Sequence, residues 1–299
     1  MSAATVALLP DRGVVRVAGE DAGKFLQGVI TNDMDVLATA PALHAGLLSP
    51  QGKILFDFFV YRAPEGFLVE TARTMAADLV RRLSMYKLRA KVAIEDASSD
   101  FTVAVLWGGA LAASASDRPG PLVAPDPRHP DLGLRLLLSL FSDWVLAESG
   151  ATPAPQEDYH AHRIALGVPE AGRDFVLGDT FPHEALYDQL NGLSLTKGCY
   201  VGQEVVSRME HRGTARKRIV PVVGNAELPP SGTEIRAGEV AMGTLGSTAG
   251  PRGLALLRLD RVAEMSRKGV PLTAHGVPLE VVLPAWARFS LAPDATDVR

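Results

Sequence analysis

The chain has 299 residues, 47% of them apolar and 21% charged, which allows one large domain or two to three ordinary ones and excludes a disordered chain. Its formal net charge of −4 argues against a dedicated nucleic-acid binder, and its single cysteine excludes an intrachain disulfide and a four-cysteine zinc site. Residues 1–10 lack the pattern of a secretion signal, and no apolar run approaches a membrane span. We therefore expect a cytoplasmic protein without a membrane partner.

The first half of the chain predicts mixed α and β structure. A type I turn at Ser49-Pro50-Gln51-Gly52 joins two apolar segments and predicts a β-hairpin. Residues 114–130, rich in Pro, Asp and Ala, predict a surface connection. In chain order we expect a strand at 14–17, a helix at 22–29, the hairpin at 44–61, a helix at 74–86 and strands at 87–94, 101–107 and 132–138.

Two of these strands carry charged residues on defined faces. In the hairpin, Asp57 shares a face with Leu55 and Phe59, so it either points to solvent or faces a cavity, where burial would suit it to proton transfer. In the strand expected at 87–94, Leu88 belongs to an apolar side, and Lys87 and Arg89 belong to a basic one.

The second half predicts a helix at 157–166, closed by Gly167 and Pro169. From Arg218 onward, short apolar runs alternate with Gly and Pro turns, a pattern typical of a small all-β unit. We therefore predict an α+β region at 1–217, in two sub-units that divide near 100–155, and a β unit at 218–299.

Residues 194–209 contain the densest motif. Apolar residues at 201, 205, 206 and 209 predict a helix, with Ser194 or Thr196 as its N-cap. Cys199 would then lie in or just before the first turn, where the helix terminus and Lys197 would lower its thiol pKa. The alternative is that Cys199 is a small buried residue of the core.

Eight consecutive residues, Lys197 to Glu204, read Lys-Gly-Cys-Tyr-Val-Gly-Gln-Glu, and this run resembles the signature of the YgfZ family of folate-binding proteins. That family is related to the glycine-cleavage T-protein, an aminomethyltransferase, and includes a mitochondrial iron–sulfur assembly factor. Further similar segments are 19–33, 48–57 and 86–92, so the resemblance covers most of residues 14–218.

The resemblance implies an aminomethyltransferase-like fold, with two ferredoxin-like α+β units and a C-terminal β-barrel around a central cavity for tetrahydrofolate. Independently of the resemblance, His160, His162 and His183 lack the spacing of metal ligands, so we expect no metal site. For the chemistry the resemblance implicates Cys199, Lys197 and Asp57. For binding of folate it implicates Glu184, Asp57, Tyr200, Gly202, Gln203, Glu204, Arg208 and Arg212.

The roles of Glu184 and the arginines have a chemical reason. A carboxylate at Glu184 can accept two hydrogen bonds from the pterin ring, whereas the alternative is an exposed loop acid. Arginines at 208 and 212 can clamp the carboxylates of the folate tail, whereas the alternative is a solvated helix end.

The function implied is a tetrahydrofolate-binding accessory protein that supports assembly or repair of iron–sulfur enzymes, including tRNA-thiolating ones, with Cys199 as reactive thiol. The T-protein hairpin carries two adjacent acids, but here the pair reads Phe56-Asp57, which argues against efficient aminomethyl transfer. Two alternatives stay open: a folate-dependent aminomethyltransferase or demethylase, and a structural or interaction protein with a vestigial cavity.

Overall fold

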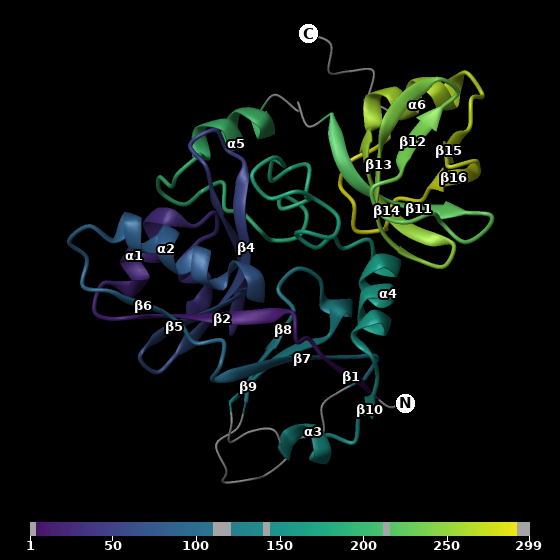
Figure 1. Ribbon diagram of the computed structural model, residues 1–299. Coiled ribbons are helices and arrows are strands. Elements are labelled where there is room, and N and C mark those ends of the chain that lie inside the picture. Colours follow the sequence, from purple (N-terminus) through teal and green to yellow (C-terminus); the bar gives the residue numbers. More distant parts are fainter. Residues whose placement is uncertain (1–3, 110–120, 140–143, 212–215, 292–299) are drawn as a thin grey trace. The chain divides into compact units, whose positions relative to one another are not determined.

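The computed structural model describes residues 4–109, 121–139, 144–211 and 216–291 (Figure 1). The chain forms two compact units: the first comprises residues 1–159 and 190–203, and the second residues 160–189 and 204–299. This division does not follow the boundary expected at 217/218, because segments 160–189 and 204–217 group with the C-terminal residues. The assignment of 1–217 and 218–299 as domains stays a prediction.

One sheet of the first unit has the strand order β3-β4-β5-β2-β6 and is antiparallel throughout. Helices α1 and α2 pack on one of its faces, and the apolar side chains between them form the core, Phe56 among them. Its strands are β2 (Arg12–Ala18), β3 (Ala42–Leu48), β4 (Ile54–Ala63), β5 (Gly66–Ala72) and β6 (Ala93–Asp96). Its helices are α1 (Ala22–Val29), η1 (Met34–Ala38), η2 (Arg73–Met75) and α2 (Ala76–Lys87).

The other sheet of the first unit has the order β10-β1-β7-β9-β8 and a smaller apolar core. Its strands are β1 (Thr5–Leu8), β7 (Phe101–Trp107), β8 (Leu122–Pro125), β9 (Leu134–Ser139) and β10 (Thr152–Pro153), with η3 (Pro130–Leu132) and α3 (Trp144–Glu148) between them. Strand β9 begins after Gly133, where φ is +84° and a Cβ would lie 2.1 Å from the carbonyl oxygen of Leu106. Only glycine fits at this position, where the chain entering β9 approaches the backbone of β7.

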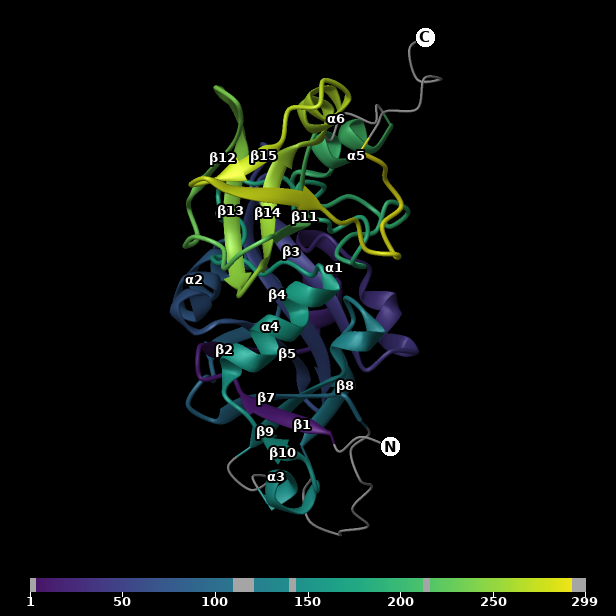
Figure 2. The ribbon, with the colours of Figure 1, turned by 90° about the vertical axis from the view of Figure 1, so that its right-hand side faces the viewer.

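The second unit contains a closed six-stranded barrel, drawn in green to yellow in Figures 1 and 2. Its strands are β11 (Lys217–Gly224), β12 (Glu234–Ala237), β13 (Val240–Ala249), β14 (Arg252–Arg258), β15 (Leu272–Ala274) and β16 (Val277–Val281), in the order β11-β14-β13-β12-β15-β16. Inward apolar residues such as Val220, Ile235 and Leu257 fill it. Helix α6 (Leu259–Arg267) follows β14, and α4 (Gln156–Leu166) and α5 (Gln203–His211) run from one unit's residues into the other's.

The predicted mixed α+β architecture with a C-terminal barrel is confirmed, as are the hairpin and the helices near 22–29, 74–86 and 157–166. Three local predictions are wrong. A strand was expected at 87–94, but α2 continues to Lys87 and a turn follows. The strand β6 begins only at Ala93. The C-terminal unit includes helix α6. The connection expected at 114–130 contains β8, and its residues 114–120 lie outside the described range.

No helix among the described residues is long and apolar enough to cross a membrane.

Candidate functional site

The segment 197–202, here called the Cys199 arch, is anchored at its start by Lys197. The ammonium group of this buried lysine donates to the carbonyl oxygens of Ile30, at 2.9 Å, and Asn32, at 2.7 Å. Ile30 is the C-cap residue of α1. A cation there satisfies carbonyl groups at the negative end of the helix dipole, although it comes from a residue 167 positions away.

The environment of this lysine is partly desolvated. Burial lowers the pKa of Lys197 to about 8, and the nearby charge of Asp33 only partly opposes that shift. The Lys197 ammonium also lies 5.3 Å from the centre of the Tyr200 ring, within cation–π range. Burial raises the pKa of Tyr200 to about 12, so its hydroxyl keeps its proton. That hydroxyl is buried and has no hydrogen-bond partner among the described residues.

The arch is anchored at its other end by Gly202. Its φ is +82°, and a Cβ there would lie 2.6 Å from the carbonyl oxygen of Ser49 and 3.0 Å from the Cβ of Leu48. The backbone therefore contacts the turn of the β3–β4 hairpin at a distance that only glycine permits. Lys197, the first residue of the motif, and Gly202, its second glycine, therefore hold the two ends of the arch against other residues of the first unit.

Between these anchors, Cys199 is exposed. The alternative in which it fills the core is therefore excluded. The predicted helix begins later than expected, because α5 starts at Gln203 and Cys199 lies four residues before it. Ser194, expected as an N-cap, instead accepts the N–H groups of Thr196 and Lys197 in a local turn. The argument from a helix N-terminus therefore does not apply to Cys199.

The segment that leads into the arch is fixed by residues 31–32. The hydroxyl of Thr31 donates to the Gly192 carbonyl at 2.6 Å. The amide of Asn32 donates to the carbonyls of His44 and Asn191, at 2.8 Å each. The N–H of Ser194 donates to the Thr31 carbonyl. These buried bonds set the position from which the arch departs.

Asp57 is also buried, with 7% of its surface exposed, so the alternative in which it points to solvent is excluded. Its Oδ1 lies 2.8 Å from Nε2 of His44, and Nδ1 of the same ring lies 3.1 Å from the carbonyl oxygen of Leu190. A carbonyl only accepts, so Nδ1 carries a proton, and the Nε2···Oδ1 contact needs a second proton shared between imidazole and carboxylate. The contact fixes the orientation of the Asp57 carboxylate beside the imidazole.

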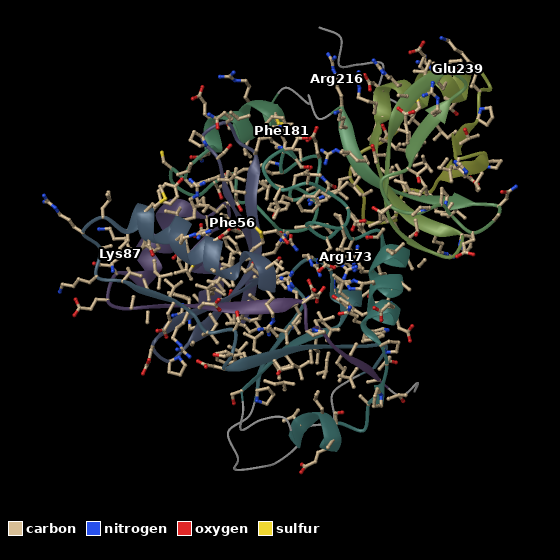
Figure 3. The ribbon with its side chains drawn as sticks, viewed as in Figure 1. Phe56, Lys87, Arg173, Phe181, Arg216 and Glu239 are labelled. Atoms are coloured by element: carbon tan, nitrogen blue, oxygen red, sulfur yellow. The ribbon has the colours of Figure 1, made fainter. Side chains whose placement is uncertain are left out.

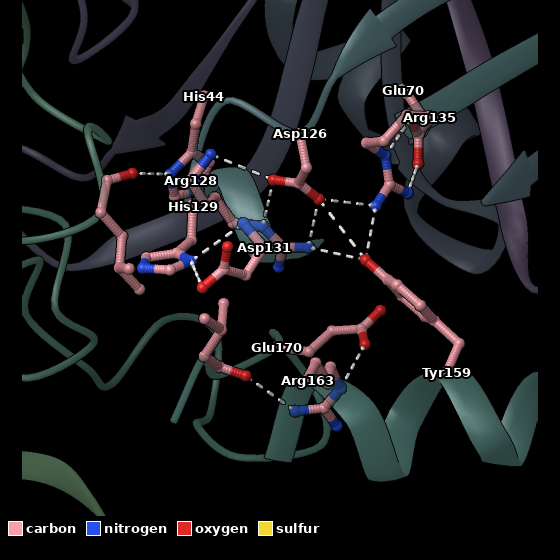
Figure 4. A network of polar contacts seen from close by, with 12 residues as sticks. His44, Glu70, Asp126, Arg128, His129, Asp131, Arg135, Tyr159, Arg163 and Glu170 are labelled. Atoms are coloured by element: carbon pink, nitrogen blue, oxygen red, sulfur yellow. Dashed lines mark hydrogen bonds and ion pairs between the residues drawn. The ribbon is translucent and has the colours of Figure 1, made fainter. Parts of the chain in front are cut away.

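A buried ion network around Glu70 lies on the same face of β4 and β5 as Asp57, and Figure 4 shows part of this network. Glu70 receives the guanidinium groups of Arg135 and Arg12, the latter at 2.8 Å, and the hydroxyl of Tyr61 at 2.7 Å. Burial alone would raise the pKa of Glu70, but Arg135 and Arg12 more than offset it, and the pKa is lowered. The network joins β2 and β5 of one sheet to β9 of the other.

Asp126 continues the network from the end of β8. It accepts from Arg128 at 2.8 Å and from Arg135 at 3.2 Å, and Figure 4 shows Tyr159 beside them. The guanidinium groups of Arg135 and Arg128 lie 4.3 and 4.9 Å from the centre of the Phe59 ring. These contacts satisfy the buried charges, so we assign the network a structural role in supporting Asp57 and its strand.

In the second unit, the half-buried Glu184 uses one carboxylate oxygen to accept the N–H of Phe181 at 2.9 Å. Its backbone carbonyl accepts from Ile219 of β11. The neighbouring His183 is buried, and its Nε2 lies 2.9 Å from Glu210 of α5. Its Nδ1 is buried without a partner among the described residues. The segment of His183 and Glu184, which is predicted to bind the pterin ring, thus forms hydrogen bonds to β11 of the barrel and to α5.

Three of the remaining predicted residues, Gln203, Glu204 and Arg208, lie on α5. Glu204 and Arg208 form an exposed ion pair with each other at 2.8 Å, so they offer a folate tail a solvent-screened contact. Gln203 begins the helix and is half-buried. Arg212 lies outside the described residues. The role of these residues in binding folate stays a prediction.

Sequence reasoning missed His44 and the anchoring role of Thr31 and Asn32. A signal for His44 existed, because the alternation of the hairpin places positions 44 and 57 on one face of adjacent strands. No local pattern marks Asn32 as the partner of Asn191, since that contact joins residues 159 positions apart.

Comparison with known proteins gives two domain matches and a fold. Residues 10–114 match the GCVT N-terminal domain, and residues 216–289 match the CAF17 C-terminal beta-barrel domain. The glycine cleavage system aminomethyltransferase T from Bartonella henselae has the same fold, with a TM-score of 0.73 over 95% of this chain and 86% of that one. At 16% identity this likeness shows the fold alone.

The curated relatives are more informative. The human mitochondrial iron–sulfur cluster assembly factor IBA57 is 35% identical over 277 residues, which cover 85% of this chain and 77% of the human one. The homologue from Mycosarcoma maydis is 37% identical over 234 residues, 73% of this chain, and this chain spans 56% of that protein's length.

These relatives correct one prediction. The expectation of a cytoplasmic protein is wrong against this comparison, because the relatives are named as mitochondrial. That expectation rested on the lack of a secretion signal in residues 1–10 and of a long apolar run, and neither observation distinguishes the cytoplasm from the mitochondrion. On the identity and coverage of these matches, the chain belongs to the family of IBA57 iron–sulfur cluster assembly factors.

Proposed function

We propose that this protein is an iron–sulfur cluster assembly factor whose Cys199 binds, transiently, the iron of a cluster held by a partner protein. The names of its relatives support a role in assembly. The observation that carries the role of the thiol is its position: Cys199 is exposed on an arch whose two ends are fixed by Lys197 and Gly202.

A single cysteine cannot hold a cluster alone, because clusters take about four protein ligands. The step is therefore a ligand exchange. The Cys199 thiol gives up its proton and forms an Fe–S bond, while a bond from iron to a partner's thiolate breaks and that thiolate takes up a proton. No electron is transferred. A fixed, exposed thiol suits this exchange because it needs no rearrangement to reach a docked partner.

We further propose tetrahydrofolate as the small-molecule ligand, as the aminomethyltransferase-like fold suggests. The buried Nδ1 of His183, next to Glu184 in the chain, has no partner among the described residues and supports a polar ligand at this segment, since such groups are rarely left unsatisfied. Glu184 keeps one carboxylate oxygen for the pterin ring beyond its bond to Phe181. When bound, the folate would supply a carrier for a one-carbon unit.

Efficient aminomethyl transfer is not the favoured activity. Phe56, which stands where the T-protein has its first acid, is packed in the core against the helices. Asp57 is held by His44. An aminomethyltransferase would form methylene-tetrahydrofolate from an aminomethyl or N-methyl donor. Formation of this product therefore distinguishes aminomethyl transfer from a role in cluster assembly alone.

The test of the thiol uses cells that depend on this protein, with the activity of an iron–sulfur enzyme, a tRNA-thiolating one included, as the readout. Cys199→Ser should reduce that activity at least tenfold at unchanged protein level. Ser266→Ala, an exposed hydroxyl on α6, is the control and should be neutral. Full activity of Cys199→Ser refutes the role of the thiol.

The test of the ligand is calorimetry with tetrahydrofolate. Saturable binding is expected, and Glu184→Ala should weaken it about tenfold, which corresponds to about 1.4 kcal/mol. Absence of saturable binding to the wild-type protein contradicts the folate proposal and favours a vestigial cavity.

A further inference from the structure

The turn that ends helix α2 exposes an apolar residue in a strained conformation. Leu88 is 89% exposed, with φ of 47° and ψ of −109°. The N–H of Ala90 donates to the carbonyl of Lys87 at 2.8 Å, which closes a four-residue turn with Leu88 at its second position. These angles are those of a type II′ turn, whose second position is normally glycine. The chain thus places a leucine in a strained backbone conformation and leaves most of its surface exposed.

The surroundings of Leu88 combine a second apolar side chain with positive charge. Met85, one helical turn earlier, is 69% exposed. Residues 76–91 contain one acid and five bases, although the whole chain has a net charge of −4. Arg82, Lys87 and Arg89 have no ion-pair partner among the described residues, whereas Arg81 pairs with Asp78 and Lys91 with Glu20. Figure 3 labels Lys87 on the part of the first unit that carries α1 and α2.

Neither feature helps the free protein to fold. A non-glycine residue with positive φ is strained, and an exposed leucine contributes almost no burial. An exposed apolar group bordered by basic side chains is typical of a surface that another molecule covers. We call Arg82, Met85, Lys87, Leu88 and Arg89 the α2 surface. Met85, Leu88 and Arg89 are exposed, and Arg82 and Lys87 are half-buried.

We propose that the α2 surface docks an acidic protein, with Leu88 as the apolar anchor and Lys87 and Arg89 facing carboxylates of the partner. The proposal rests on the proposed function, in which the partner is a protein that holds or receives the cluster. Charge complementarity favours an acidic protein. Three bases between residues 82 and 89, without ion-pair partners in the described part of the chain, attract RNA or an anionic membrane only weakly, since both are bound through larger basic clusters.

The test places the photocrosslinker p-benzoylphenylalanine at position 88 of the full chain, in cells that depend on it. We expect an adduct with an acidic protein that carries or receives an iron–sulfur cluster, and we expect Lys87→Glu combined with Arg89→Glu to abolish it. The control position is Val282 of the second unit, which is 45% exposed and should give no such adduct. Adducts with lipid, RNA or a basic protein, no adduct, or an adduct that survives charge reversal would each overturn the proposal.

A second measurement distinguishes the loss of docking from a loss of stability and from the loss of the Cys199 thiol. With the crosslinked partner purified, Leu88→Gly should weaken binding at least tenfold while its melting temperature equals or exceeds that of the wild type. In an assembly assay it should raise the partner concentration needed for half-maximal rate and leave the maximal rate unchanged. Cys199→Ser should lower the maximal rate instead. Leu88→Gly with unchanged binding refutes docking alone, and active Cys199→Ser refutes the proposed function alone.

Discussion

The lysine that anchors the Cys199 arch makes a specific prediction about pH. Replacing Lys197 by Met keeps the length and apolar stem of the side chain but removes the ammonium from its two carbonyl acceptors, Ile30 and Asn32. At neutral pH two effects oppose each other: the lost hydrogen bonds destabilise the variant, and the relief of desolvation stabilises it. The absolute difference is therefore uninformative, whereas its pH dependence is diagnostic.

The magnitude follows from the lowered pKa. The folded-state pKa of Lys197 is about 8, against 10.5 for the ordinary side chain. Between these values the unfolded chain binds a proton that the folded chain lacks, so the stability that this group contributes rises with pH. From about pH 7 to about pH 9.5, the wild type should gain about 2 kcal/mol of unfolding free energy from this group. The Met variant should lack this gain.

The assay is urea unfolding of both proteins across this pH range. The difference in unfolding free energy, wild type minus Lys197→Met, should grow by about 2 kcal/mol as the pH rises. Lys24→Met, at an exposed position of α1, is the matched control and should show a constant difference. A difference for Lys197→Met that is also constant would show that its ammonium is not desolvated, and the account of the anchor would be wrong.

Three further predictions concern the same unit, each measured by urea unfolding. Gly202→Ala should destabilise it by about 1–3 kcal/mol, because its Cβ would meet the Ser49 carbonyl; an unchanged value contradicts the close contact. Glu70→Gln should cost about 3–5 kcal/mol, because Arg12 and Arg135 lose their buried carboxylate; a loss below 1 kcal/mol would be inconsistent with the network. Asp57→Asn should cost less than about 1 kcal/mol, since the amide can donate to Nε2 of His44, whereas Asp57→Ala should cost about 1–3 kcal/mol; equal costs argue against the shared proton.

Much of the fold was predictable because its signals are local. The turn at residues 49–52, the helix at 157–166 closed by Gly167 and the short barrel strands each follow from turn chemistry or from periodicity of apolar residues. The site was predictable in part for a different reason. The motif from Lys197 to Glu204 drew attention to the segment of the candidate site, and in the structure its cysteine is exposed.

The errors share a physical cause. The strand expected at 87–94 alternates apolar and polar residues, but α2 continues to Lys87 and a turn follows, so Leu88 is in solvent and not in a core. The helix expected from Ser194 starts at Gln203, because the buried bonds of Lys197 and residues 31–32 hold the preceding backbone in an irregular path. Contacts between distant segments decide both cases, and they leave no local pattern in the sequence.

The irregular path is itself informative about function. A helix beginning at Ser194 would have stabilised the arch through its own backbone bonds, but it would have fixed Cys199 on a helical surface. The chain instead anchors the arch with a lysine at the C-terminal end of α1 and a glycine against a hairpin turn, and it leaves the cysteine between them exposed. Since the anchors act on either side of Cys199, a substitution at position 199 should leave the backbone in place. Loss of assembly activity in Cys199→Ser would therefore report on the sulfur atom and not on the fold.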